Sequence, residues 1–112
     1  MSEQRTFKVK EPKKIEDGVH FGKIIGVEYR DQPYEYTDLV IEFENGCRIK
    51  AGFPSMITPV NKLGKAMILF GASIEIGKEL NPASTFVSKE CQFMTMTENG
   101  FARIVPGSLK PK

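Results

Sequence analysis

An Asn-Gly dipeptide at residues 45 and 46 separates two segments, 36–44 and 47–53, in which apolar and polar side chains alternate. Both central residues of a type I′ turn have positive φ, which Asn-Gly tolerates, so the pattern predicts a β-hairpin. The alternation gives one face an apolar set: Leu39, Ile41, Phe43, Cys47, Ile49, Ala51 and Phe53. It gives the other face a more polar set: Tyr36, Asp38, Val40, Glu42, Arg48 and Lys50. We expect the first set in the core and the second in water.

Three further segments have the composition of strands. Residues 18–29 are rich in β-branched and aromatic side chains and contain Gly22 and Gly26, which predict a long strand with a bulge or sharp coil. Residues 30–35 contain Asp and Pro and predict a loop. Residues 89–97 alternate again, 98–100 predict a tight turn, and 101–105 predict a last strand that ends before Pro106 and Gly107.

The period changes to that of a helix after residue 54. Thr58 is a candidate N-cap with Pro59 at the first helical position, and Gly71 is a candidate C-terminal stop. Between them, apolar side chains recur at helical spacing: Val60, Leu63, Met67 and Phe70. Residues 72–88 predict a connection that contains at most a short strand or a helical turn.

This order of elements predicts an all-β chain of five strands with one helix between strands 3 and 4. It is the order of an OB-fold, a five-stranded, partly open Greek-key barrel that binds oligonucleotides or oligosaccharides. We therefore expect a basic, flexible N-terminal arm at 1–14, an OB-fold-like domain at 15–107 and a short basic tail at 108–112.

Charge is distributed unevenly along the 112 residues, which hold 16 basic and 14 acidic side chains. Residues 1–14 carry five basic and two acidic residues, the last three residues carry two lysines, and the remainder carries 9 basic and 12 acidic residues. Cationic ends around a mildly acidic body are typical of arms that contact nucleic-acid phosphates, although solvated tails have the same composition.

The composition disfavours a membrane or secreted protein, and it also disfavours a fold built on zinc or disulfides. No apolar run approaches the roughly 18 residues of a membrane span, and residues 1–14 lack the apolar centre of a signal peptide. We therefore expect a cytoplasmic protein without membrane contact. Cys47 and Cys91 are too few for a zinc cluster or a disulfide framework, and we expect both to be buried apolar residues.

The strand pattern also resembles a family, the small phage and prophage-type single-stranded DNA-binding OB proteins, over most of the chain. That family tends to have a helix that ends in Leu-Gly, a Gly-Lys pair before the fourth strand and a late Asn-Gly hairpin. Here the corresponding positions are Phe70-Gly71, Ser88-Lys89 and Asn99-Gly100. The resemblance implies an OB-fold and sequence-nonspecific binding of single-stranded DNA in replication or recombination.

Binding of single strands needs aromatic faces for the bases and cations for the phosphates. The sequence offers candidates in three places: Tyr36, Arg48 and Lys50 on the polar face of the hairpin, Arg30 and Tyr34 at the loop after the first strand, and Phe101 and Arg103 at the last hairpin. An alternative remains for the cations, because Arg48 and Lys50 can instead pair with Asp38 and Glu42 across the hairpin. Tyr29 and Phe101 are also candidates for core positions.

An enzyme is the less favoured class, and we expect no catalytic residues, metal or cofactor. The only histidine, His20, lies inside a predicted strand, and the glycines nearby do not form a phosphate-binding loop before a helix. The expected partner is single-stranded DNA, with RNA as an alternative ligand and a second copy or replication and recombination proteins as further partners.

The competing function is an OB-fold docking module that binds proteins and no nucleic acid. Met94 and Met96 would supply its adaptable apolar surface. Whether they do depends on which side of strand 4 faces the core, and the sequence leaves both sides open.

Overall fold

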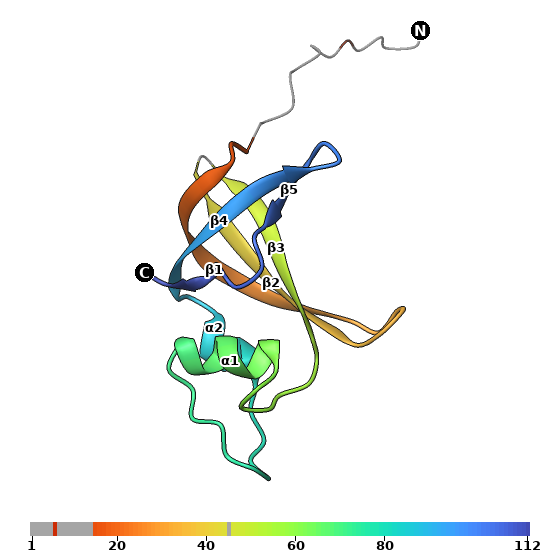
Figure 1. Cartoon of the computed structure of the whole chain (residues 1–112), viewed down its shortest axis with the longest axis vertical. Helices are drawn as coiled ribbons and strands as arrows, with labels where there is room; N and C mark the ends of the chain where they lie inside the picture. Colours follow the sequence, from red (N-terminus) through yellow and green to blue (C-terminus); the bar gives the residue numbers. More distant parts are fainter. Residues whose placement is uncertain (1–5, 7–14, 45) are drawn as a thin grey trace, which may run out of the picture.

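A computed structural model describes Thr6 and residues 15–44 and 46–112, so the predicted arm at 1–14 lies, apart from Thr6, outside the described residues. The described chain is mostly β and forms one strongly twisted antiparallel sheet with two short helices at one end (Figure 1). The elements are β1 (Gly18–Arg30), β2 (Tyr36–Phe43), β3 (Cys47–Pro54), α1 (Lys62–Leu69), α2 (Pro82–Phe86), β4 (Glu90–Glu98), β5 (Phe101–Ile104) and β6 (Lys110–Pro111).

The strand order in the sheet is β3-β2-β1-β4-β5, and β6 pairs with β4. All of these pairs are antiparallel. In the described part of the chain β3 and β5 are the two ends of this path and share no ladder of hydrogen bonds, so the sheet is open. The sequence predicts a partly open, five-stranded Greek-key barrel, whereas the described residues form an open antiparallel sheet of six strands.

The β2–β3 hairpin confirms the central prediction from the sequence. Leu39 lies opposite Ala51 and Ile41 opposite Ile49, so the apolar sets of the two strands share the buried face as expected. The connection is one residue longer than a type I′ turn, because Phe43 pairs with Cys47. Gly46 has φ +77°, as in a three-residue loop with a left-handed last residue, and Asn45 lies outside the described residues.

Strand β1 belongs to both halves of the sheet. Its residues 18–23 pair with β4 and its residues 22–30 pair with β2, with a register shift between Ile24 and Gly26. This irregularity is the predicted bulge. Gly22 lies where both neighbours approach, and a Cβ there would lie 2.7 Å from the carbonyl oxygen of Glu42, which explains a glycine inside the strand.

Helix α1 begins three residues later than predicted. Asn61 is the N-cap, since its side chain accepts from Gly64 N–H, while the Thr58 hydroxyl accepts from the N–H groups of Val60 and Asn61 in a turn before the helix. Val60 is consequently exposed. The predicted end at Gly71 is confirmed, because Gly71 has φ +100°. The Gly71 N–H donates to the carbonyl oxygen of Ile68, and the N–H of the following residue, Ala72, donates to that of Met67.

Two short elements follow α1 and β5: α2 lies in the segment 72–88, where a helical turn is one of the expectations, whereas β6 lies in the residues expected to be a short basic tail. Helix α2 follows Asn81, whose side chain accepts from Ala83 N–H, and begins with Pro82. Strand β6 pairs with β4, and the preceding Leu109 is buried in the core. Residues 108–112, which the sequence predicts to be a tail, therefore belong to the folded unit.

The core fills the concave side of the sheet and is closed by the two helices. Its largest fully buried side chains include Ile24, Leu39, Leu63, Phe86 and Phe93. Phe86 of α2 packs edge-on against Phe70 at the end of α1, with ring centroids 5.2 Å apart. No helix within the described ranges has the length and apolar character that a membrane crossing requires.

Candidate nucleic-acid interface

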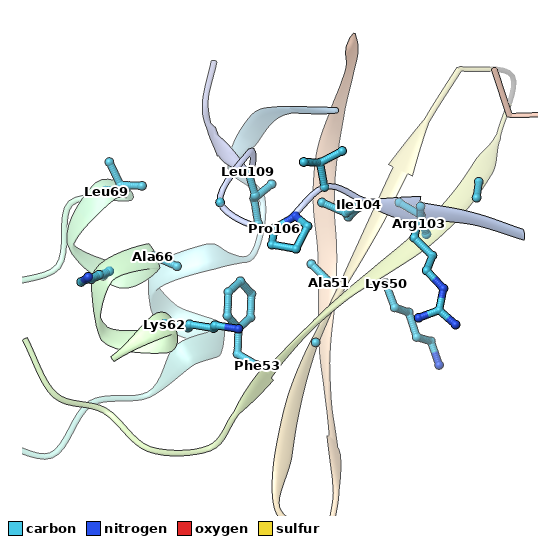
Figure 2. A pocket seen from close by; sticks show the side chains of 16 residues that line it. Lys50, Ala51, Phe53, Lys62, Ala66, Leu69, Arg103, Ile104, Pro106 and Leu109 are labelled. Atoms are coloured by element: carbon cyan, nitrogen blue, oxygen red, sulfur yellow. The ribbon is translucent and has the colours of Figure 1, made fainter. Parts of the chain in front are cut away.

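A cleft of about 600 Å³ occupies the gap between the two open edges of the sheet. One wall is β3, the opposite wall is β5 with the turn after it, and α1 forms the base (Figure 2). The apolar lining comes from all three elements and from the segment before β6: Ile49, Ala51, Phe53, Ala66, Leu69, Ile104, Val105, Pro106 and Leu109. Its size is within the range of sites that hold a small-molecule ligand.

Four basic side chains line this cleft: Lys50, Lys62, Lys65 and Arg103. Among the described residues that line it, none is acidic. Figure 2 shows Lys50 and Arg103 extending in the same direction, and Lys62 of α1 and Phe53 of β3 also line the cleft. The described body has nearly balanced charge, so the cleft is a local concentration of positive charge.

The lysines of α1 differ from the other two cations in their surroundings. Lys50 Nζ lies 2.7 Å from Glu28 Oε2, and Arg103 Nε lies 4.0 Å from Glu98 Oε2. Within residues 15–44 and 46–112, Lys62 and Lys65 take part in no ion pair. All four side chains are exposed, so phosphate oxygens can compete for them at little cost.

The predicted cations of the polar face are held by carboxylates. Arg48 pairs with Glu42, its partner in the ladder, at 3.3 Å, as the alternative interpretation of the sequence expected. Lys50 pairs with Glu28 of β1 instead of Asp38 or Glu42, and the hydrogen bond with Glu28 raises the pKa of Lys50. These pairs are exposed and leave the face near neutrality.

Arg30 is fixed by a different arrangement. Its guanidinium donates to both carboxylate oxygens of the buried Asp38, at 2.5 and 3.0 Å, and lies over the ring of Tyr36 at 4.9 Å from the ring centroid. The hydrogen bond with Asp38 raises the pKa of Arg30. Because Asp38 is buried, this pair has a structural role in addition to any contact with ligand, and it covers one face of Tyr36.

The predicted aromatic residues divide into exposed and covered rings. Tyr34 in the β1–β2 loop is 72% exposed and Phe101 at the start of β5 is 70% exposed, so both rings are accessible to bases. Tyr29 is exposed as well, so neither Tyr29 nor Phe101 occupies the core position for which it is a candidate in the sequence. Half-buried Phe53, in contrast, presents its ring inside the cleft (Figure 2).

The structure brings two of the seven predicted site residues, Lys50 and Arg103, to this cleft, and the sequence does not predict Lys62, Lys65 or Phe53 as site residues. A signal for the lysines existed, because residues three apart lie on the same side of a helix. Their approach to β3 and β5 depends on tertiary packing. Tyr34, Tyr36 and Arg30 lie around the β1–β2 loop and do not line the cleft, although Arg30 and Tyr36 approach the lining residue Gly52.

The buried titratable side chains His20 and Cys91 have surroundings that indicate a structural role. His20 is buried beside Phe43 and Phe93, with Nδ1 2.7 Å from Glu44 and Nε2 2.7 Å from the carbonyl oxygen of Glu16. Burial raises the pKa of the Cys91 thiol to about 11. In the described ranges no group of three or more His, Cys, Asp or Glu side chains is placed to hold a metal ion.

The chain was compared with protein families and with curated proteins. No family model and no curated protein matches it. The cleft, its charge and the exposed rings are therefore the features of the molecule that indicate a function.

Proposed function

We propose that this protein binds single-stranded DNA without sequence preference, with the cleft between β3 and β5 as the centre of the binding surface. The observation that supports the proposal most directly is the lining of the cleft, in which four cations and one aromatic ring meet without a described acidic residue. A cationic groove that follows the backbone, combined with aromatic faces for the bases, is the general requirement for single-strand binding.

In this proposal the phosphates contact Lys50, Lys62, Lys65 and Arg103, and one base packs against Phe53 and the apolar wall. A 600 Å³ cleft holds little more than one nucleotide, so neighbouring bases extend toward Phe101 and, at the other end of the sheet, Tyr34. Stacking on each exposed ring contributes about 1–3 kcal/mol.

The proposal also includes the fold. We infer an OB-fold-type sheet that is left open between β3 and β5, since the order β3-β2-β1-β4-β5 brings the two ends of the path to opposite walls of one cleft. A detail of the resemblance supports this interpretation. Ser88 has φ 72° at the position where the family has glycine, and positive φ is the conformation that favours glycine.

The experiment is a fluorescence anisotropy titration of labelled oligo(dT) of about 20 nucleotides, a length above the site size of one such domain. The wild-type protein should bind at low salt, and its affinity should fall steeply as salt rises, because binding releases counterions from phosphates. The double variant Lys62→Ala/Lys65→Ala should bind at least tenfold more weakly and reduce the salt slope by roughly 1.4, or about 0.7 for each lost phosphate contact.

The matched control is Lys78→Ala/Lys89→Ala, which removes the same charge from exposed positions that do not line the cleft. It should change affinity by no more than about twofold, as expected if only the overall field is altered. Equal losses for the two double variants would show that net charge, and not the cleft, governs binding. Absence of any anisotropy change for the wild-type protein at low salt and tens of micromolar would refute the proposal itself.

A further inference from the structure

The outer side of β4 and of its neighbours β1 and β5 presents a row of apolar side chains to solvent. We call this row the β4 platform, and its members are Val19, Phe21, Met94, Met96 and Phe101. They share one side of the sheet, because Val19 is paired with Met94 in the ladder and Phe101 is paired with Glu98 of the same strand. The alternate residues of β4 are buried, among them Phe93, so the platform faces away from the core.

Basic side chains lie beside this row. Arg103 of β5 is paired with Met96 in the ladder, and Lys110 of β6 lies on the opposite side of β4 from β1. Lys112 Nζ lies 5.7 Å from the centroid of the Phe21 ring. Within residues 15–44 and 46–112, Lys110 and Lys112 take part in no ion pair. The charged residues that border the platform are Lys23, Arg103, Lys110 and Lys112 on the basic side and Glu90 and Glu98 on the acidic side. The surface is therefore positive overall.

The mixture of apolar side chains and cations favours a polyanion as the occupant of the platform. The centres of protein–protein interfaces are depleted in lysine, whereas here the ammonium group of Lys112 lies at the Phe21 ring itself. A single strand of nucleic acid uses this combination, because its bases contact rings and apolar side chains while its phosphates contact cations. A second copy of this chain would bring an equally positive surface against the first, so charge complementarity selects the nucleic acid.

The platform is continuous with the cleft. Arg103 lines the cleft and is paired with Met96 of the platform, so one cation belongs to both surfaces. Phe101, to which bases extend in the proposed function, lies at this end of the row. From here the platform follows β4 to Phe21, which is paired with Gln92. The stretch of β4 from Glu98 to Gln92 is about 20 Å long at about 3.3 Å per residue, which several nucleotides are needed to cover.

We propose that the β4 platform is a second binding surface for single-stranded DNA, along which the strand continues after it leaves the cleft at Arg103. Bases contact Phe101, the two methionines and Phe21, and phosphates contact Lys110 and Lys112. This inference rests on the proposed function and extends it, because the cleft holds little more than one nucleotide. Oligonucleotides long enough to cover the platform therefore bind more tightly than those that reach only the cleft.

The test compares oligo(dT) of about 20 nucleotides with oligo(dT) of about 4 nucleotides, the lower limit of the site size of such a domain, in the same anisotropy assay. Phe21→Ala should weaken binding of the long oligonucleotide about tenfold, as expected for the loss of one stacked base. It should change binding of the short one by no more than about twofold. Lys110→Ala/Lys112→Ala should also weaken binding of the long oligonucleotide alone, and should lower its salt slope by roughly 1.4.

A carboxylate introduced at two exposed apolar positions provides a matched control. Met94→Glu places the charge on the platform and should weaken binding of the long oligonucleotide at least tenfold, because the carboxylate repels phosphates. Ile76→Glu places the same side chain at a fully exposed position between α1 and α2, outside the platform and the lining of the cleft. It should change the affinity by no more than about twofold. Circular dichroism should show the wild-type fold in each variant, since all of these side chains are exposed.

Unchanged affinity for the long oligonucleotide in Phe21→Ala and Met94→Glu, with Lys62→Ala/Lys65→Ala still impaired, would overturn the platform and leave the cleft as the binding surface. Equal losses in Met94→Glu and Ile76→Glu would also overturn it, because net charge would then explain the effect. A wild-type dimer in sedimentation velocity that Met94→Glu dissociates without loss of DNA affinity would assign the platform to a second copy instead. If the wild-type protein binds neither oligonucleotide, the proposed function itself fails, which is a separate result.

Discussion

Replacing His20 tests whether the core of this small sheet contains a charged imidazole. The Nδ1 atom lies 2.7 Å from Glu44 Oε1 and the Nε2 atom 2.7 Å from the carbonyl oxygen of Glu16, so both ring nitrogens face acceptors. Only the imidazolium carries a hydrogen on each nitrogen. Burial by itself lowers the pKa of His20, but the hydrogen bonds to Glu44 and Glu16 outweigh it, and the pKa is raised above 6.5.

The variant His20→Gln removes the charge and the ring. The charge-assisted bond to Glu44 contributes about 1 kcal/mol after a discount for the exposure of that carboxylate. The contacts with the rings of Phe43 and Phe93, at centroid distances of 5.2 and 5.8 Å, contribute about 0.5–1 kcal/mol each. We therefore expect the free energy of unfolding to fall by about 2–3 kcal/mol at pH 6.

The sign of the pH dependence follows from the raised pKa. The stabilisation by the imidazolium is fully present below the pKa of the unfolded chain, near 6.5, and is lost as the pH rises through the higher pKa of the folded state. The difference between wild type and His20→Gln should therefore shrink by about 1 kcal/mol between pH 6 and pH 8.5. Urea unfolding followed by circular dichroism measures both differences.

A second measurement isolates the cause. His20 is the only histidine, so a single imidazole resonance reports its pKa in an NMR titration. We expect a value above 6.5 in the wild type and a lower value in Glu44→Gln, which removes the negative charge beside Nδ1 and keeps an acceptor oxygen. A wild-type value below 6.5, or an unfolding difference that is constant between pH 6 and pH 8.5, would refute the reasoning.

Three further predictions concern packing. Gly64→Ala should lower the free energy of unfolding, measured in urea, by about 3 kcal/mol, because the added Cβ would lie 1.6 Å from the carbonyl oxygen of Thr58. This loss outweighs the gain in helix propensity of roughly 1 kcal/mol. A stabilised variant would contradict this geometry. Phe86→Ala should cost about 3–5 kcal/mol by thermal denaturation, since the ring is fully buried, and a loss below 1 kcal/mol would place the ring outside the core. Cys91, with a pKa of about 11, should resist alkylation by iodoacetamide at pH 8 until the protein unfolds. Mass spectrometry measures the rate of alkylation, and equal rates in buffer and in urea would contradict the burial of Cys91.

The parts of the fold that depend on short-range pattern could be predicted from the sequence. The alternation around residues 45 and 46 assigned the buried face of β2 and β3, and Asn99-Gly100 forms a two-residue turn with positive φ at both positions. The N-cap of α1 was misplaced because Thr58 and Asn61 both satisfy the capping pattern, and only the turn before the helix decides between them.

The candidate site could be predicted only in part, because its residues meet through tertiary packing. The pattern of the hairpin leaves open that Arg48 and Lys50 pair with Asp38 and Glu42. The structure has the Arg48–Glu42 pair, but the pairing of Lys50 with Glu28 depends on the position of β1 beside β2. The sequence also left open which side of β4 is buried. In the structure the side with Phe93 faces the core, and the side with Met94 therefore faces solvent.

The bulge in β1 has a mechanical consequence for the cleft. The two hairpins, β2–β3 and β4–β5, are joined in the sheet through β1 alone, in the described part of the chain. Adjacent strands of a sheet are rotated by about 20–25° relative to each other, and these rotations add up from β3 to β5. A small change of twist at residues 24–26 therefore produces a larger displacement of β3 relative to β5. The width of the cleft therefore depends in part on the twist of a central strand, and substitutions near the bulge should change that width without altering a residue that lines the cleft.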